Sequence, residues 1–366
     1  MFLSIHTDLD GDPKFIFQIR NQLIGSMKKK NPFLLIAIFI FVVHASNCLA
    51  QNRRNNKSFI ETISFGSCNK HELPQPLWNP IMAENPNVWI WLGDIVYGDT
   101  HDMDLLEEKY TLQKDILDYR RLRLNTSVIG IWDDHDYGIN DGGKYFVQKA
   151  ASQERLLDFL DEPEDSPRRK QEGAYASYSY GIVNNSVKVI LLDTRFHRDT
   201  LFKEDRKYLP NLEGSMLGEV QWAWLEKELQ NSTARINIIA SGIQVIPTEH
   251  PFEKWSNFPK EREHLLNLIS SSKAKNPVLI SGDRHIAEIS LLKDQRFPNG
   301  LYEITSSGLT HTWPSYREEY NPYRIGNLIA SLHYGTVNFD WDNEWMTYYI
   351  KGEKAQIYLE QKIPIR

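Results

Sequence analysis

Three carboxylates surround one histidine in residues 132–136, which read Trp-Asp-Asp-His-Asp. Like charges this close repel one another, so a cation or a buried proton must offset them. The segment continues directly from an apolar run, which favours an internal position over the alternative, a solvated acidic loop. We therefore expect residues 132–136 to supply oxygen ligands to a metal ion.

A further carboxylate ends another apolar run, in the segment Gly-Asp-Ile-Val-Tyr at residues 93–97. The phenol of Tyr97 follows Asp94 by three residues and can turn back toward it. Hard anionic oxygens of this kind suit a trivalent iron, and a carboxylate has two oxygens with which to bridge a pair of metals. Gly-Asp also ends many strands as a plain turn, so this motif is weak alone.

A third cluster, Gly-Asp-Arg-His at residues 282–285, repeats the arrangement late in the chain. Asp283 and His285 are two residues apart on a predicted tight turn, so both side chains can point to one centre. Cys68 ends a fourth apolar run, where it is a metal ligand, a reactive thiol or a small buried side chain. Together these positions predict one shared metal centre.

The apolar runs that precede these clusters are short and nearly continuous, which is typical of strands in a sheet covered on both faces. Helical spacing is found at residues 104–122 and 217–229. Strand alternating with helix predicts an α/β layered fold whose ligands gather at the carboxyl ends of the strands. The predicted strands are residues 59–65, 88–92, 128–132, 187–192, 236–240 and 278–280.

The pattern changes toward the C-terminus. Residues 336–341 and 345–350 alternate in polarity and are followed by residues 356–360, which predicts an antiparallel hairpin and a closing strand. Residues 161–172 are dense in charge and contain two prolines, so we expect an exposed loop there. No internal repeat or long linker divides residues 51–366, which predicts a single domain with elaborated loops.

In their order along the chain, these blocks resemble the metal-binding motifs of the calcineurin-like metallophosphoesterases. Gly-Asp-x-x-Tyr at 93–97, Asp-His-Asp at 134–136 and Gly-Asp-x-His at 282–285 follow the order of the blocks of purple acid phosphatases. The joint order is much more specific than any single block.

The chain resembles the alkaline phosphatase D (PhoD-like) family still more closely. This family is distinguished by Ser-Cys on the first strand, by Trp-Asp-Asp-His and by Leu-Asp-Thr-Arg, which match residues 67–68, 132–135 and 192–195. The resemblance implies a four-layer α/β/β/α metallophosphoesterase sandwich with a ferric ion and one or more calcium ions, other divalent metals being the alternative. By position, Asp94 resembles the bridging ligand.

The resemblance also implies which metal ion each of the remaining candidate ligands would bind. It places Cys68, Tyr97 and His285 on iron. Asp134 stands where the superfamily often has an asparagine ligand of the second metal, and Asp283 replaces a histidine of the purple acid phosphatases. Carboxylate in place of nitrogen favours a hard ion such as Ca²⁺. Three further residues near loop ends are candidate ligands, with loop polarity or a helix cap as the alternative: Asn140, Asp141 and His311.

The implied reaction is the hydrolysis of a phosphate monoester or diester, in which a metal-activated hydroxide attacks phosphorus. His135 would lie beside the phosphate as a positioned donor, and Arg195 would bind phosphate or brace the acidic cluster. The predicted protein is thus a metal-dependent phosphoester hydrolase of the phosphodiesterase or alkaline phosphatase type. The alternative is a secreted binding protein that keeps the fold without turnover.

The charge balance argues against a nucleic-acid partner. The chain has 42 basic and 48 acidic residues, and no run of Lys or Arg in residues 51–366 could follow a nucleic-acid backbone. Hydrophobic residues make up 41% of the chain and include ten Trp, which is enough for a large packed core.

An export signal is predicted at the N-terminus. Three lysines at 28–30 precede an apolar run at 33–43 and small or polar residues that end at Ala50. This run is about half the length needed to span a bilayer, so we expect no permanent span in the mature chain. We predict that residues 1–50 form a leader with its true start at Met27, a buried helix being the alternative.

The predicted location is therefore periplasmic, extracellular or on the cell surface. Cys48 keeps a lipid anchor open as an alternative to free export, although residues 45–47 match a lipoprotein signal poorly. Cleavage after Ala50 would leave Cys68 as the one remaining cysteine, so no disulfide within the mature chain is expected.

Overall fold

The computed structural model describes residues 60–182, 184–205, 207–313 and 319–366. Every described residue belongs to one compact unit of the chain. The predicted leader, with Cys48, lies outside the described residues. Among the helices that the structure describes, none is long and apolar enough to cross a membrane.

The first of two large sheets has six strands in the order β15-β14-β13-β1-β2-β3. Strands β1, β2 and β3 are parallel to one another, so their carboxyl ends lie at one edge. The C-terminal strands join them antiparallel and confirm the predicted hairpin and closing strand. The strands are β1 (Thr62–Gly66), β2 (Val88–Leu92), β3 (Ser127–Ile131), β13 (Tyr334–Asp340), β14 (Trp345–Lys351) and β15 (Ile357–Pro364).

The second large sheet has seven strands in the order β12-β10-β11-β9-β8-β5-β4. Its middle strands β5, β8 and β9 are parallel, and they are the remaining three predicted strands. The sequence analysis did not predict β4, β10, β11 or β12. The strands are β4 (Ala176–Ile182), β5 (Asn185–Leu192), β8 (Ile236–Ser241), β9 (Pro277–Ser281), β10 (Ala287–Leu292), β11 (Leu301–Ser306) and β12 (Arg324–Ile329).

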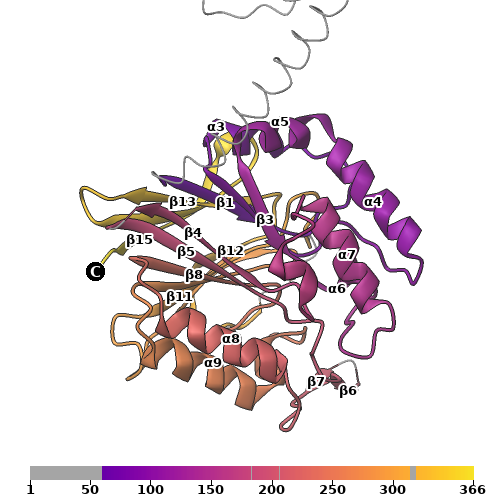
Figure 1. The fold of residues 1–366 in the computed structure, drawn as a ribbon. Coiled ribbons are helices and arrows are strands. Elements are labelled where there is room, and N and C mark those ends of the chain that lie inside the picture. The colour runs from indigo at the N-terminus through magenta and orange to yellow at the C-terminus, as the bar shows by residue number, and fades with distance from the viewer. Residues whose placement is uncertain (1–59, 183, 206, 314–318) are drawn as a thin grey trace, which may run out of the picture. The chain divides into compact units, whose positions relative to one another are not determined.

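Helices cover the outer faces of the two sheets (Figure 1). Helices α3 and α5 pack on the first sheet, and α8 and α9 pack on the second. Helix α4 packs against α7, and a short β6–β7 hairpin projects beside the second sheet. The elements are α3 (Trp78–Ala83), α4 (Met103–Asp115), α5 (Leu117–Asn125), α6 (Asp134–Tyr137), α7 (Lys149–Phe159), α8 (Gly218–Gln230), α9 (Pro259–Ser271), β6 (Phe202–Glu204) and β7 (Lys207–Leu209).

Two apolar cores explain why the central strands are apolar throughout. Successive side chains of a strand point to opposite faces of its sheet. In β8, Ile238 and Ala240 belong to the core between the sheets, whereas Ile239 belongs to the core under α8 and α9. Each face is therefore buried, and the predicted α/β/β/α sandwich is confirmed.

A cluster of aromatic rings fixes the outer helices to the first sheet. The ring centroid of Trp78 on α3 lies 5.2 Å from that of Trp89 and 5.5 Å from that of Trp91, both on β2. The indole of Trp91 also donates a hydrogen bond of 3.0 Å to the hydroxyl of Tyr119 on α5. Truncating Trp91 to alanine would remove this packing at a cost of about 3–5 kcal/mol.

Two local predictions need correction. The helix expected at residues 104–122 is broken at Ile116, whose extended ψ of 121° separates α4 from α5. Residues 161–172 are not exposed throughout, because Arg168 is buried and its guanidinium donates to the carbonyl oxygens of Gly130 and Ala174. No glycine or proline marks the break at Ile116, and no local pattern marks Arg168 as buried.

Candidate metal centre

The predicted metal-binding residues all follow the carboxyl ends of parallel strands. Cys68 lies after β1, Asp94 after β2, Asp134 at the start of α6 after β3, and Asp283 and His285 after β9. Their side chains form groups whose nitrogen, oxygen or sulfur atoms lie within 4.8 Å of one another. Five residues predicted from separate blocks are therefore brought together.

Tight turns direct these side chains inward. Cys68, Asp94, Asp283 and His285 have positive φ angles of 59°, 50°, 69° and 55°, a region that non-glycine residues rarely adopt. Such strain persists where the surrounding structure enforces it, and it gathers at functional sites. Gly93 has a φ of 91°, and a Cβ atom there would lie 2.3 Å from that of Asp133. The glycine thus permits β2 and β3 to end side by side.

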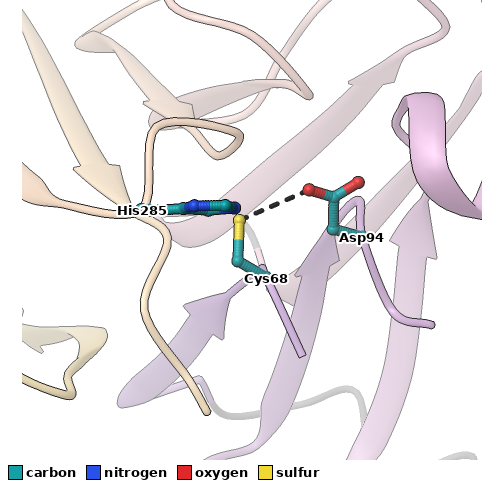
Figure 2. A group of neighbouring side chains, drawn as sticks. All are labelled: Cys68, Asp94 and His285. Carbon is teal, nitrogen blue, oxygen red and sulfur yellow. Dashed lines mark hydrogen bonds between the residues drawn. The ribbon is translucent and has the colours of Figure 1, made fainter. Parts of the chain in front are cut away.

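The first group of ligand atoms comes from Cys68, Asp94 and His285 (Figure 2). The thiol sulfur of Cys68 lies 3.4 Å from Oδ2 of Asp94, which accepts its hydrogen bond. Burial, with the neighbouring charge of His311 next in effect, lowers the pKa of His285 to about 3. The imidazole of His285 is therefore neutral, the form in which histidine ligates a metal.

The phenol of Tyr97 completes this group. Its oxygen lies 2.9 Å from Nε2 of His285 and 2.9 Å from Nε2 of His311. Burial raises the pKa of the Tyr97 phenol and of the Cys68 thiol, and the charge of Asp94 raises both further. A highly charged cation would be needed to hold them as phenolate and thiolate.

A second group consists of carboxylates, with Asp133, Asp134 and Asp283 within reach of one another. Burial, and then repulsion between them, raises the pKa of Asp133 and Asp283 well above the usual range of a carboxyl group. Burial also raises the pKa of Asp94, and the negative charges of Asp134 and Asp283 raise it further. In Asp134, the charges of Arg195 and His135 outweigh the effect of burial, and the pKa is lowered.

Two buried carboxylate oxygens indicate that these groups are suited to bind a metal ion. Oδ1 of Asp94 and Oδ2 of Asp133 have no hydrogen-bond partner in the described structure. Burying a carboxylate oxygen without a partner lowers the stability of the fold, and a bound cation commonly offsets this cost. The side chains that would hold metal here are those of Cys68, Asp94, Tyr97, Asp134, Asp283 and His285, and Asp94 belongs to two of the groups.

Asp136 has a different task from its neighbours. Its carboxylate accepts hydrogen bonds from the backbone nitrogens of Asp133, Asp94 and Ile95, at 2.7, 3.1 and 3.0 Å. These bonds tie the loop after β2 to the loop after β3. Asp136 is therefore a structural residue that positions Asp94, rather than a member of the group that faces a cation.

Arg195 lies wholly beneath the acidic groups. It has no exposed surface, and it pairs with Asp133 and Glu253 at 2.7 Å each. Of the two roles predicted for Arg195, this geometry favours bracing the acidic cluster over binding phosphate. Glu253, on the long loop between β8 and α9, also pairs with Arg198 at 3.0 Å.

His135 is held by a residue that the sequence analysis did not single out. Its Nδ1 lies 2.8 Å from a carboxylate oxygen of Asp99, and its ring packs against that of Tyr97 with centroids 4.1 Å apart and the ring planes tilted by 33°. Burial opposes protonation, but the Asp99 hydrogen bond and the charges of Asp94 and Asp134 prevail and raise the pKa of His135 to about 10. With Nδ1 occupied, Nε2 is the nitrogen that can donate.

The three further candidates have different surroundings. Asn140 is exposed, while His311 contacts Tyr97 as described. Asp141 lies near Asp134 and Glu253, but it also forms an ion pair with Lys203 and accepts a 2.6 Å hydrogen bond from Tyr208 of the β6–β7 hairpin. No signal in the sequence pointed to Glu253 or Asp99, because both depend on how distant loops meet.

Solved structures confirm the class of fold. A structure of PhoD superposes with a TM-score of 0.68 at 18% identity, covering 83% of this chain and 68% of that one. A dimetal phosphatase from Danio rerio superposes with a TM-score of 0.56 at 15% identity, covering 84% of this chain and 100% of the other. The chain thus has the metallophosphoesterase fold.

The particular family follows from the sequence comparison. The model of the PhoD-like phosphatase family matches residues 107–340, which is more than half of the chain, and the chain belongs to that family. Alkaline phosphatase D of Bacillus subtilis is 27% identical over 186 residues. This stretch covers 44% of the present chain and 31% of that relative.

Proposed function

We propose that this protein is an exported hydrolase of phosphate esters that works with a ferric ion and calcium. The observation that carries the proposal is the position of Asp94, which is shared by the group of Cys68 and His285 and by the group of Asp134 and His135. A carboxylate that is shared by two clusters of ligand atoms suits a pair of metal ions held close together.

In the proposed reaction, the oxygen of a water-derived hydroxide forms a bond to phosphorus while the bond to the ester oxygen breaks. Metal ions, when bound, would supply the positive charge that stabilises the phosphoryl oxygens. The chain's own contribution comes from His135, whose Nε2 would give its proton to the departing alkoxide while Asp99 holds Nδ1. Asp136 and Arg195 keep the acidic side chains in place.

Export rests on the predicted leader of residues 1–50. Mass spectrometry of the protein recovered outside the cytoplasm should find a chain that begins near Gln51. Recovery of a cytoplasmic chain that begins at Met1 or Met27 would overturn this part of the proposal.

Turnover is tested with bis(p-nitrophenyl) phosphate and p-nitrophenyl phosphate, with the metal content of the same sample measured. We expect hydrolysis of at least one ester and loss of both metal and turnover in Asp94→Asn. The Lys260→Gln variant is a matched control, since this exposed lysine on α9 pairs with Glu213 away from the centre. Bound metal without hydrolysis of several esters would instead identify a binding protein.

A further inference from the structure

Lys70 is fixed beside the metal centre by its neighbours. The preceding residue, Asn69, donates its backbone N–H to the carbonyl oxygen of Asp94 at 2.8 Å, and its buried side chain donates to Ile95. The backbone N–H of Lys70 itself donates to the hydroxyl of Thr310 at 2.8 Å. The base of the lysine side chain therefore has a defined position two residues after Cys68.

The ammonium group of Lys70 lies over the ring of Tyr97, with Nζ 4.7 Å from the ring centroid. The hydroxyl of that ring contacts His285 and His311. Lys70 thus lies against the ring whose hydroxyl faces the group of Cys68 and His285.

Lys70 forms no ion pair with a carboxylate in the described part of the chain. The nearest acidic residue in sequence, Glu72, pairs with His71 instead. Lys144 and Lys203 each pair with an aspartate. A contact between an ammonium group and an aromatic face is weak at a partly exposed site, so Nζ can leave the ring for an anion.

We propose that Lys70 is a specificity-determining residue whose ammonium group binds a nonbridging phosphoryl oxygen of the substrate and so favours phosphate monoesters over diesters. This inference rests on the proposed function and concerns the same site. A monoester carries close to two negative charges above pH 7, because its second ionisation lies near pH 6, whereas a diester carries one. The attraction of a fixed ammonium group rises with that charge.

The expected effect is on affinity. A hydrogen bond between charged groups corresponds to roughly 10- to 100-fold in binding. Lys70→Gln should raise KM for p-nitrophenyl phosphate by about this factor, and KM for bis(p-nitrophenyl) phosphate by only about 3-fold. The value of kcat and the metal content should stay near those of the wild type, since uniform binding is lost and no metal ligand is removed.

The experiment compares Lys70→Gln, Lys70→Arg and Lys362→Gln with the wild-type protein. Lys70→Arg keeps the charge and should recover most of the monoester affinity. Lys362 is a matched control, because its Nζ lies 4.5 Å from the centroid of the Trp345 ring. These residues belong to β15 and β14, at the edge of the first sheet away from β2 and β3. Binding of inorganic phosphate and of dimethyl phosphate to the metal-loaded proteins is measured by calorimetry alongside the kinetics.

The inference is overturned if Lys70→Gln raises KM for the two esters by the same factor. It is also overturned if the variant loses metal or has a lower kcat, since Lys70 would then support the centre rather than select the substrate. A wild-type protein that hydrolyses neither ester would refute the proposed function. In that case the calorimetry still decides on Lys70: a selective loss of inorganic phosphate over dimethyl phosphate supports the inference, and equal binding by wild type and variant refutes it.

Discussion

Replacing Arg195 with methionine separates a structural role from contact with the substrate. The side chain has no exposed surface, and its guanidinium pairs with Asp133 and Glu253 at 2.7 Å each. Its removal leaves the buried Asp133 carboxylate without its ion pair, while Glu253 keeps its pair with Arg198. Breaking a buried ion pair typically costs about 3–5 kcal/mol. For a domain of this size, the thermal midpoint should fall by roughly 5–8 °C.

The assay is thermal unfolding of metal-loaded and metal-free Arg195→Met, followed by circular dichroism, together with the kinetics of ester hydrolysis. The thermal midpoint of Arg195→Lys should lie between those of Arg195→Met and the wild type, because one ammonium group cannot make both ion pairs with the same geometry. An unchanged midpoint with a raised KM would refute the reasoning and show that the guanidinium binds the substrate.

Three other changes have distinct expected outcomes. Cys68→Ser should bleach or shift a visible charge-transfer band and weaken iron retention. Unchanged colour and iron, with a free energy of unfolding lowered by about 1–3 kcal/mol, would mean that Cys68 is only a core residue. His135→Ala should keep its metal and lose roughly 10²–10⁴ in kcat, and loss of metal as complete as in Asp94→Asn would refute the donor role. Burial lowers the pKa of His333 to about 4 from 6.5, so the unfolded chain binds its proton first as the pH falls. Stability should therefore fall by about 3 kcal/mol between pH 6.5 and 4, and His333→Gln should flatten this slope in denaturant titrations, whereas an unaltered slope would argue against it.

The clustering of the candidate metal ligands could be predicted from the sequence because its signals are local. Each block joins an apolar strand to polar residues at its carboxyl end, and parallel strands bring such ends to one edge. Cys68, Asp94 and His285 could therefore be expected to meet although they come from distant parts of the chain. Continuous apolar strands likewise indicated a sheet buried on both faces.

Other features depend on contacts that have no local signal. Asp99 and Glu253 lie in loops, and only the folded chain shows that they hold His135 and Arg195. Residues 134 and 136 are both aspartates but have different roles. Asp134 belongs to the candidate ligand groups, whereas the carboxylate of Asp136 accepts hydrogen bonds from three backbone N–H groups. The helix break at Ile116 has no glycine or proline to mark it.

The central claim is that Asp94 joins two metal ions in one hydrolytic centre. Elemental analysis of the wild-type protein and of Asp94→Asn, both purified without added metal, tests it most directly when turnover is measured on the same samples. We predict iron together with a second metal in the wild-type protein, and a parallel loss of both metals and of hydrolysis in the variant. An active wild-type protein without metal, or an Asp94→Asn variant with full metal content and full turnover, would contradict the account.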